Sequence, residues 1–226
     1  MSTTPSVIVF DVNGTLSDMS AMARHFTETG APAHLAQLWF AGVLRDGFAL
    51  AASGDNAGFA DIGAESLRGL LRPLPLNRDP DQAVEHIMGA FSELAVHTDV
   101  PGGIRQLKSA GFRLVTLSNG SPEVAGRLFR TAGIREDFEA LLSVQDAAAW
   151  KPAKAAYDYA ARACGTGPAE MLLVAVHPWD IHGASRAGLR TAWLNRPRTE
   201  YPAYFQAPDY TIGSLEELPA VLGRGA

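Results

Sequence analysis

The chain contains short runs of hydrophobic residues, and each run ends in polar residues or glycine. Four runs are strong and two are weaker, and they cover residues 7–10, 112–117, 171–176 and 191–194, then 141–144 and 210–212. Each run is too short for an independent helix, and strands that are hydrophobic on both faces are typical of a buried parallel sheet. The pattern therefore predicts a parallel sheet built from these runs.

Helical patterns lie between the runs, and most of them are followed by a glycine. They cover residues 103–110, 122–132, 154–164 and 182–187. Ser121 suits an N-cap, Pro122 suits the first helical position, and Gly133 suits the turn that ends the helix. The alternation predicts an α/β fold, a doubly wound Rossmann-like parallel sheet with its active site at the carboxyl ends of the strands.

Residues 17–97 interrupt this alternation. They contain no clear strand, and helical patterns cover residues 21–29, 33–51, 65–71 and 81–96. Such a stretch is too long for one ordinary crossover connection. We therefore predict a Rossmann-like catalytic core formed by residues 1–16 and 98–226, with an inserted helical cap formed by residues 17–97. A set of plain crossover helices is the alternative.

Composition and charge narrow the functional classes. The 226 residues carry a formal net charge of −5, which argues against a general nucleic-acid binder. The single cysteine, Cys164, excludes an intrachain disulfide and favours a reducing, cytoplasmic setting. No stretch is hydrophobic over the ~18 residues that a membrane span needs, and the N-terminus does not resemble a signal peptide. We expect a cytoplasmic protein without a membrane or nucleic-acid partner.

Polar side chains follow two of the predicted strands directly. Asp11 comes after the first strand and precedes the Asn13-Gly14 turn. A carboxylate held there suits a nucleophile or a metal ligand, and an aspartate that only makes an Asx turn is the alternative. Ser118 and Asn119 precede a predicted helix N-terminus, an arrangement that suits anion binding or simple helix capping.

Two further motifs lie later in the chain. Lys151 precedes a proline, which favours an extended backbone, and its ammonium group would keep Asp11 ionised if the two were paired. A surface lysine is the alternative. His177 follows a strand and precedes Trp179-Asp180. Its imidazole suits a general base near neutral pH, and a hydrogen-bonded structural histidine is the alternative.

The order of these motifs resembles the haloacid dehalogenase superfamily. Members of that superfamily carry an aspartate, a serine or threonine, a lysine and a last aspartate at successive strand ends. This chain matches the order with Asp11, Ser118, Lys151 and Asp180. The resemblance extends from residue 7 to about residue 194 and includes the early helical cap.

Two departures separate the chain from the magnesium-dependent phosphatases of that superfamily. Asn13 stands where those enzymes carry a general-acid aspartate, and an amide cannot donate and recover a proton as a carboxyl group can. Val176 stands where they carry a metal-binding aspartate, whereas magnesium needs hard oxygen ligands. The resemblance therefore implies no metal and no organic cofactor.

Several motifs are similar to the metal-free 2-haloacid dehalogenase branch. They are Trp179-Asp180, Lys151-Pro152 with Tyr157 downstream, and Leu38-Trp39 in the cap. By this resemblance, the catalytic residues are Asp11 as nucleophile, with Thr15, Ser118, Lys151, His177 and Asp180. The substrate-binding residues implied are Val12, Asn13, Trp39, Phe40, Arg45, Asn119, Tyr157 and Trp179.

The chain also departs from that branch. The usual aromatic residue after the nucleophile and the usual serine and asparagine of the last motif are replaced by Asn13, Ala175 and His177. Phe40 replaces the arginine that receives the leaving halide in the family. Arg45 is close in sequence, but on a helix it lies about 140° around from position 40. It is therefore no automatic substitute, and Arg24 is another candidate.

The resemblance implies hydrolysis of short 2-haloalkanoic acids to 2-hydroxy acids. Asp11 would attack the halogen-bearing carbon, release halide and form an ester, which water activated by His177 or Asp180 would hydrolyse. The partners implied are a small halogenated carboxylic acid and the halide product, and a homodimer is compatible with the family. A phosphatase or other hydrolase of the same superfamily and a non-catalytic binding protein are the alternatives. The sequence leaves the halogen, the chain length and the enantiomer open.

Overall fold

A computed structural model describes residues 4–147 and 149–223 of the chain. The chain divides into two compact units. The core unit comprises Met1–Ser17 and Ala95–Ala226, and the helical unit comprises Asp18–Leu94. Each unit is described below by itself.

The core unit is built on a six-stranded parallel sheet with the strand order β3-β2-β1-β4-β5-β6. Its strands are β1 Val7–Phe10, β2 Arg113–Ser118, β3 Ala140–Ser143, β4 Met171–Ala175, β5 Arg190–Leu194 and β6 Tyr210–Ile212. All four residues of β1 are fully buried, as expected for a central strand that is hydrophobic on both faces. The predicted fold class is confirmed.

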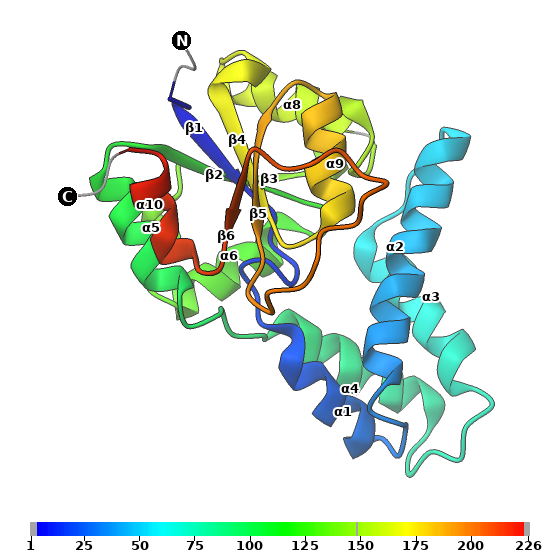
Figure 1. Ribbon diagram of the computed structural model, residues 1–226. Coiled ribbons are helices and arrows are strands. Elements are labelled where there is room, and N and C mark those ends of the chain that lie inside the picture. The colour runs from blue at the N-terminus through cyan, green and yellow to red at the C-terminus, as the bar shows by residue number, and fades with distance from the viewer. Residues whose placement is uncertain (1–3, 148, 224–226) are drawn as a thin grey trace. The chain divides into compact units, whose positions relative to one another are not determined.

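Helices cover both faces of this sheet (Figure 1). The helices of the core unit are α5 Val100–Ser109, α6 Pro122–Thr131, α7 Val144–Ala147, α8 Lys154–Cys164, α9 Pro178–Arg186 and α10 Leu218–Val221. Side chains of α5, α6 and α10 form one buried cluster with Ile8 and Phe10 of β1. Helix α9 packs on β4 and β5, with α8 beside it on the other face.

The strand order reverses at β1, because β2 lies on one side of it and β4 on the other. The next strand after β1 in the chain, β2, leads outward to β3, and β4 leads outward to β5 and β6 in the opposite direction. In doubly wound sheets such a reversal opens a crevice at the carboxyl ends of the central strands. Asp11 directly follows β1 and therefore lies at this point.

The helical unit consists of α1 Met22–Glu28, α2 Leu35–Ser53, α3 Phe59–Leu71 and α4 Pro80–Ser92. Aromatic rings fill its interior. The ring of Phe91 stacks on Phe59 with centroids 5.1 Å apart, and it meets Trp39 edge-on at 5.5 Å. Trp39 is 1% exposed and donates a hydrogen bond from Nε1 to the Gly63 carbonyl oxygen at 3.0 Å. The unit therefore has a hydrophobic core of its own.

Several helix boundaries differ from the sequence prediction. Helix α3 begins at Phe59 rather than at residue 65, because the buried Phe59 and Ile62 extend its hydrophobic face toward the N-terminus. Helix α4 ends at Ser92 rather than at residue 96, and Val96 instead forms an antiparallel bridge with Ser17. Within the described residues, no helix is both long and hydrophobic enough to cross a membrane.

Candidate active site

The loop after β1 holds a buried carboxylate. Asp11 is 4% exposed, and its backbone N–H donates to the Val174 carbonyl oxygen at 3.1 Å, which continues the sheet pairing with β4. The chain then turns through Gly14, whose φ of 78° lies in the left-handed region that favours glycine. The turn brings the Thr15 hydroxyl back to donate to Asp11 Oδ2 at 2.5 Å. The local fold thus fixes the orientation of the carboxylate.

A buried lysine joins this carboxylate to a second one. Lys151 Nζ lies 2.8 Å from Asp11 Oδ1 and 2.5 Å from Asp180 Oδ2. The Lys151 side chain is fully buried, and the two carboxylates are 5% and 0% exposed. Residues from the β1 loop, the segment before α8 and the first turn of α9 therefore meet at one ammonium group, as the strand-end argument predicts. We name this group the Asp11–Lys151–Asp180 triad.

Two neutral side chains hold the triad in place. The Tyr157 hydroxyl donates to Asp180 Oδ1 at 2.7 Å, and both residues are fully buried. Asn119 Oδ1 accepts from the backbone N–H of Lys151 at 3.0 Å, and its Nδ2 donates to the Lys151 carbonyl oxygen at 3.3 Å. Both residues thus position the triad, and the substrate contacts predicted for them stay predictions.

Burial and charge act in opposite directions on the three ionisable groups. Burial alone would raise the pKa of Asp11, but Lys151 and His177 outweigh it and hold that pKa below its ordinary value of 3.8. Burial raises the pKa of Asp180, and repulsion from Asp11 adds to it against the attraction of Lys151. Burial would lower the pKa of Lys151, but the two carboxylates raise it. Asp11 therefore has the lower pKa of the two carboxyl groups.

His177 lies at the edge of this group. Its Nε2 is 2.9 Å from the Asn13 carbonyl oxygen and 3.6 Å from Asp11 Oδ2. Because a carbonyl oxygen only accepts, Nε2 carries a proton when it makes this bond. The imidazole stacks on the Trp179 ring with centroids 5.1 Å apart, and Lys151 Nζ lies 5.8 Å from the centre of the same ring. His177, Asn13 and Trp179 therefore lie beside the triad.

The end of β2 supplies a second polar loop. Ser118 is buried, and its Oγ accepts from the backbone N–H of Gly120 at 2.9 Å. Ser143, at the end of β3, donates from Oγ to the Gly120 carbonyl oxygen at 2.9 Å. A Cβ atom at Gly120 would lie 3.3 Å from Ser118 Oγ and 3.3 Å from Asn13 Nδ2. A glycine thus permits the close approach of this loop to the Asp11 loop.

The other predicted substrate residues make contacts within their own unit. Val12 is 3% exposed and belongs to the hydrophobic cluster of the core unit. Trp39 is part of the interior of the helical unit, and the Phe40 ring lies against Phe59 at 6.3 Å between centroids. Arg45 forms an exposed ion pair with Asp46 at 2.7 Å. The substrate contacts predicted for these residues stay predictions.

Sequence reasoning missed residues that hold the Asp11 loop from outside. Arg196 donates to the Thr15 carbonyl oxygen at 3.0 Å and pairs with Asp99 at 2.9 Å. His97 Nε2 lies 3.1 Å from the Gly14 carbonyl oxygen. The sequence carries one signal for this role, because Arg196 follows the β5 run in the polar segment that ends it. The carbonyl contacts themselves have no sequence signature.

Comparisons with known proteins agree with this geometry. Residues 5–188 match the family described as haloacid dehalogenase-like hydrolase. The chain is 31% identical to the (S)-2-haloacid dehalogenase of Pseudomonas sp. (strain YL) over 92% of this chain and 90% of that one.

Two solved structures are also similar over nearly the whole chain. One is a dehalogenase with an intermediate complex, with a TM-score of 0.92 and 28% identity over 100% of both chains. The other is the L-2-haloacid dehalogenase of Xanthobacter autotrophicus with chloropropionic acid covalently bound, with a TM-score of 0.87 and 26% identity over 98% of this chain and 100% of that one. The chain therefore belongs to the haloacid dehalogenase-like hydrolase family, in the branch of the 2-haloacid dehalogenases.

Proposed function

We propose that this protein hydrolyses short 2-haloalkanoic acids to 2-hydroxy acids through an ester on Asp11. The observation that carries the proposal is the contact of one buried ammonium group with two carboxylates, which keeps Asp11 ionised at the end of β1. An ionised and rigidly held carboxylate suits nucleophilic attack. The relative with covalently bound chloropropionic acid supports a covalent intermediate.

In the first step, an Asp11 oxygen attacks the carbon that carries the halogen. A carbon–oxygen bond forms while the carbon–halogen bond breaks, and its electron pair leaves with the halide. Attack from the back of that bond inverts a chiral carbon. Lys151 at Oδ1 and Thr15 at Oδ2 orient the carboxylate for this attack. We expect the polar loop of Ser118 and Asn119 to bind the substrate carboxylate.

In the second step, water attacks the carbonyl carbon of the ester on Asp11. A base removes a proton from the water, the ester bond breaks, and the alkoxide takes up a proton to give the 2-hydroxy acid. We assign the base to Asp180. His177 Nε2 donates to the Asn13 carbonyl oxygen and carries its proton while it does so. We assign to the His177 ring, whose Nε2 lies 3.6 Å from Asp11 Oδ2, the electrostatic stabilisation of the negative charge that develops on that oxygen.

The reaction needs no metal at the triad in this proposal. Both carboxylates that could offer hard oxygen ligands converge on Lys151 Nζ instead, and that ammonium group supplies the positive charge. The halide site departs from the family pattern. Phe40 stands where the family has an arginine, and Arg45 is paired with Asp46. Halide release over fluoro-, chloro- and bromo-acids would define the specificity.

Single turnover in oxygen-18 water tests the ester. We expect a product hydroxyl without label and label in the peptide that contains Asp11, because water attacks the Asp11 carbonyl carbon. A labelled product and an unlabelled Asp11 would mean direct attack by water. Asp11→Asn should abolish halide release, and Asp158→Asn is the matched control on the exposed face of α8. Phosphate release without halide release would instead identify a phosphatase.

A second pair of variants separates the two candidate bases. Asp180→Asn should release about one equivalent of halide and then stop with the ester in place, because the base is missing only from the second step. His177→Gln should slow both halves and still turn over. If His177→Gln accumulates the ester and Asp180→Asn does not, the two roles are reversed.

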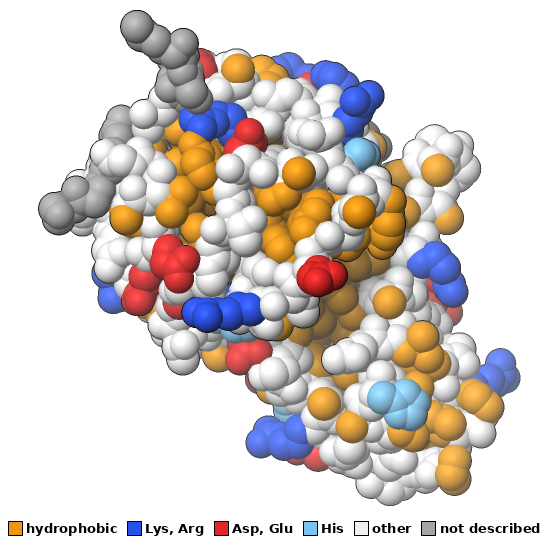
Figure 2. All heavy atoms as spheres, in the orientation of Figure 1, with side chains coloured by type: hydrophobic (Ala, Val, Ile, Leu, Met, Phe, Trp, Pro, Cys, Tyr) orange, Lys and Arg blue, Asp and Glu red, His pale blue; other side chains and the backbone are white. Residues whose placement is uncertain are grey.

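The proposed reaction and the net charge of the chain indicate which partners to expect. Halide is a product by the balance of the first step. We expect no nucleic-acid partner, because the net charge is −5 and Figure 2 shows acidic and basic side chains interspersed on the face in view. A homodimer and a cytoplasmic location stay predictions, which light scattering of the purified protein and cell fractionation would test.

A further inference from the structure

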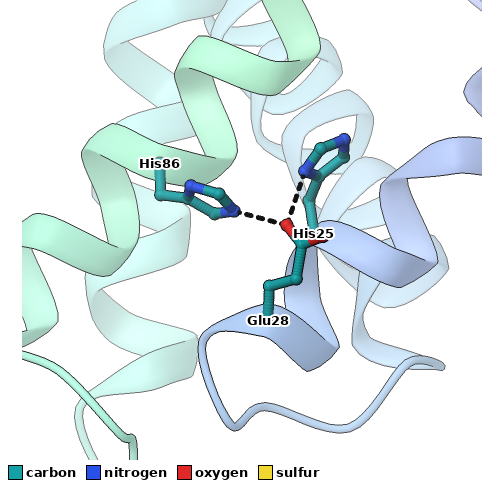
Figure 3. Close-up of side chains that lie close together, drawn as sticks. All are labelled: His25, Glu28 and His86. Atoms are coloured by element: carbon teal, nitrogen blue, oxygen red, sulfur yellow. Dashed lines mark hydrogen bonds and ion pairs between the residues drawn. The ribbon is translucent and has the colours of Figure 1, made fainter.

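Two histidines and a glutamate converge in the helical unit, and the proposed dehalogenation uses none of these three residues. His25 and Glu28 lie one turn apart on α1, and His86 reaches them from α4 (Figure 3). Glu28 Oε2 is 3.1 Å from His25 Nδ1 and 3.0 Å from His86 Nε2. The three donor atoms all lie within 4.8 Å of one another. We name these residues the His25–Glu28–His86 cluster.

The spacing of the cluster fits a tetrahedral metal ion. Zinc bonds to histidine nitrogen and carboxylate oxygen are about 2.0–2.2 Å long, which places two neighbouring ligand atoms about 3.3 Å apart. The distances from Glu28 Oε2 to the two histidine nitrogens are slightly shorter, at 3.1 and 3.0 Å. An outward movement of a few tenths of an ångström would therefore convert the hydrogen-bonded cluster into three metal ligands. The partial exposure of all three side chains, 18%, 38% and 31%, permits that movement and leaves room for water.

The charges around the cluster are compatible with a cation. A hydrogen bond from His86 holds the pKa of Glu28 below its ordinary value of 4.5, so that this carboxylate is ionised at neutral pH. Its two oxygens face different partners, because Oε2 meets both histidines while Arg24 Nε lies 3.1 Å from Oε1. The Arg24 side chain is 72% exposed and is screened by water. It leaves Oε2 directed toward the two imidazoles.

We propose that His25, Glu28 and His86 bind a divalent transition-metal ion of the zinc class, with water completing the coordination. Two imidazoles and one carboxylate suit Zn²⁺ or Ni²⁺, whereas Mg²⁺ requires oxygen ligands. Bound metal would link α1 to α4, the first and last α-helices of the helical unit. The cluster belongs to the helical unit and the triad to the core unit, and the proposed site does not depend on the reaction proposed above.

Calorimetric titration of the full chain tests the proposal after treatment with a chelator and dialysis. We expect one Zn²⁺ per chain and no binding of Mg²⁺ under the same conditions. His25→Gln and His86→Gln should each weaken Zn²⁺ binding about 100-fold, because each removes a ligand and not merely a partner of one. His34→Gln is the matched control, since His34 is an exposed histidine of the same unit. Arg24→Gln should bind Zn²⁺ at least as tightly as the unchanged chain.

Two further variants distinguish loss of the metal site from misfolding and from zinc binding at another site. Glu28→Gln keeps the size of the side chain and removes its charge, and it should also weaken Zn²⁺ binding while the circular dichroism spectrum stays unchanged. His177→Gln should leave the stoichiometry at one, because His177 belongs to the core unit. Unchanged Zn²⁺ affinity in folded His86→Gln would overturn the proposal. Loss of the Zn²⁺ signal in His177→Gln would overturn it as well, by moving the site to the triad.

Discussion

The most informative single change is Lys151→Met, which removes the ammonium group and keeps an unbranched side chain of similar length. Lys151 Nζ contacts Asp11 at 2.8 Å and Asp180 at 2.5 Å, and all three side chains are almost completely buried. The variant would leave two carboxylates buried without a counter-charge. We expect loss of activity, because Asp11 would no longer be held ionised.

The size of the stability change follows from burial. Removing one partner of a buried ion pair costs about 3–5 kcal/mol, because the remaining charge stays uncompensated. Lys151 serves two carboxylates rather than one, so we expect the upper part of this range at neutral pH. Such a loss is a large share of the ~5–15 kcal/mol that stabilises a typical domain. The variant should therefore fold but unfold at a clearly lower denaturant concentration.

The loss of stability in Lys151→Met should also depend on pH, and the pKa shifts of the carboxyl groups give the sign of that dependence. In the unchanged chain, the pKa of Asp11 lies below 3.8, so its contribution to stability is present above that pH and is lost as the pH falls. In Lys151→Met, burial and mutual repulsion would raise the pKa of both carboxyls in the folded state. As the pH falls, protonation of these carboxyl groups removes the uncompensated buried charge from the folded variant. The difference in unfolding free energy should therefore shrink toward acid pH.

Urea unfolding followed by tryptophan fluorescence would measure this difference at about pH 7.5 and about pH 5. The signal reports mainly on the core unit, which contains Trp150, Trp179 and Trp193. Lys154→Met is the matched control, because Lys154 is 65% exposed and pairs with Asp158 in one helix, where a pair contributes about 0.3–0.5 kcal/mol. Equal losses in the two lysine variants, or a loss that grows toward acid pH, would refute the reasoning.

Two further predictions concern packing and pairing around the site. Gly183→Ala should lower the free energy of unfolding by about 1–3 kcal/mol and reduce turnover, since the added methyl group would lie 2.6 Å from the Tyr157 hydroxyl. Gly69→Ala is the control, because a Cβ atom there meets no atom within 4 Å, and it should raise the free energy of unfolding by about 0.5–1 kcal/mol. Changes of the same sign in urea unfolding would contradict the argument. Asp99→Asn should lower the free energy of unfolding by about 1 kcal/mol at neutral pH, because Arg196 outweighs burial and lowers the pKa of Asp99. This magnitude is reduced because the ion pair is partly exposed to water. That stability is present above pH 3.8 and is lost below it, so a difference that persists in acid would argue against the ion pair.

The fold was predictable because short hydrophobic runs alternate with helical patterns along the core. The strands β1 and β6 coincide with the predicted runs, and α8 begins and ends where the pattern places it. The predicted helix boundaries were wrong where tertiary contacts determine where a helix begins or ends. Helix α5 begins at Val100 rather than at residue 103, although Gly102 and Gly103 lower helix propensity. A Cβ atom at Gly103 would lie 2.7 Å from the Leu215 side chain, so this glycine serves packing, which a single sequence does not display.

The triad itself was predictable because its three charged residues follow separate strands of one parallel sheet, whose carboxyl ends meet. The positioning contacts were not predictable. The substrate contact expected of Tyr157 stays a prediction, and the bond that its hydroxyl donates to Asp180 was not anticipated. Arg196 donates to a backbone carbonyl oxygen, which any residue type offers. A residue that acts by hydrogen bonding to a backbone atom or to another functional side chain leaves no pattern in the sequence.

The charge of the triad links the two chemical steps. Before reaction, Asp11 is ionised and its repulsion helps to raise the pKa of Asp180. Ester formation converts the Asp11 carboxylate into a neutral group, so this repulsion disappears, and Lys151 is left facing Asp180 alone at 2.5 Å. In the proposed mechanism, the pKa of Asp180 therefore falls at the point in the cycle when water must lose a proton. In the proposed mechanism, one buried lysine thus serves both halves of the reaction, because it contacts the proposed nucleophile in the first step and the proposed base in the second.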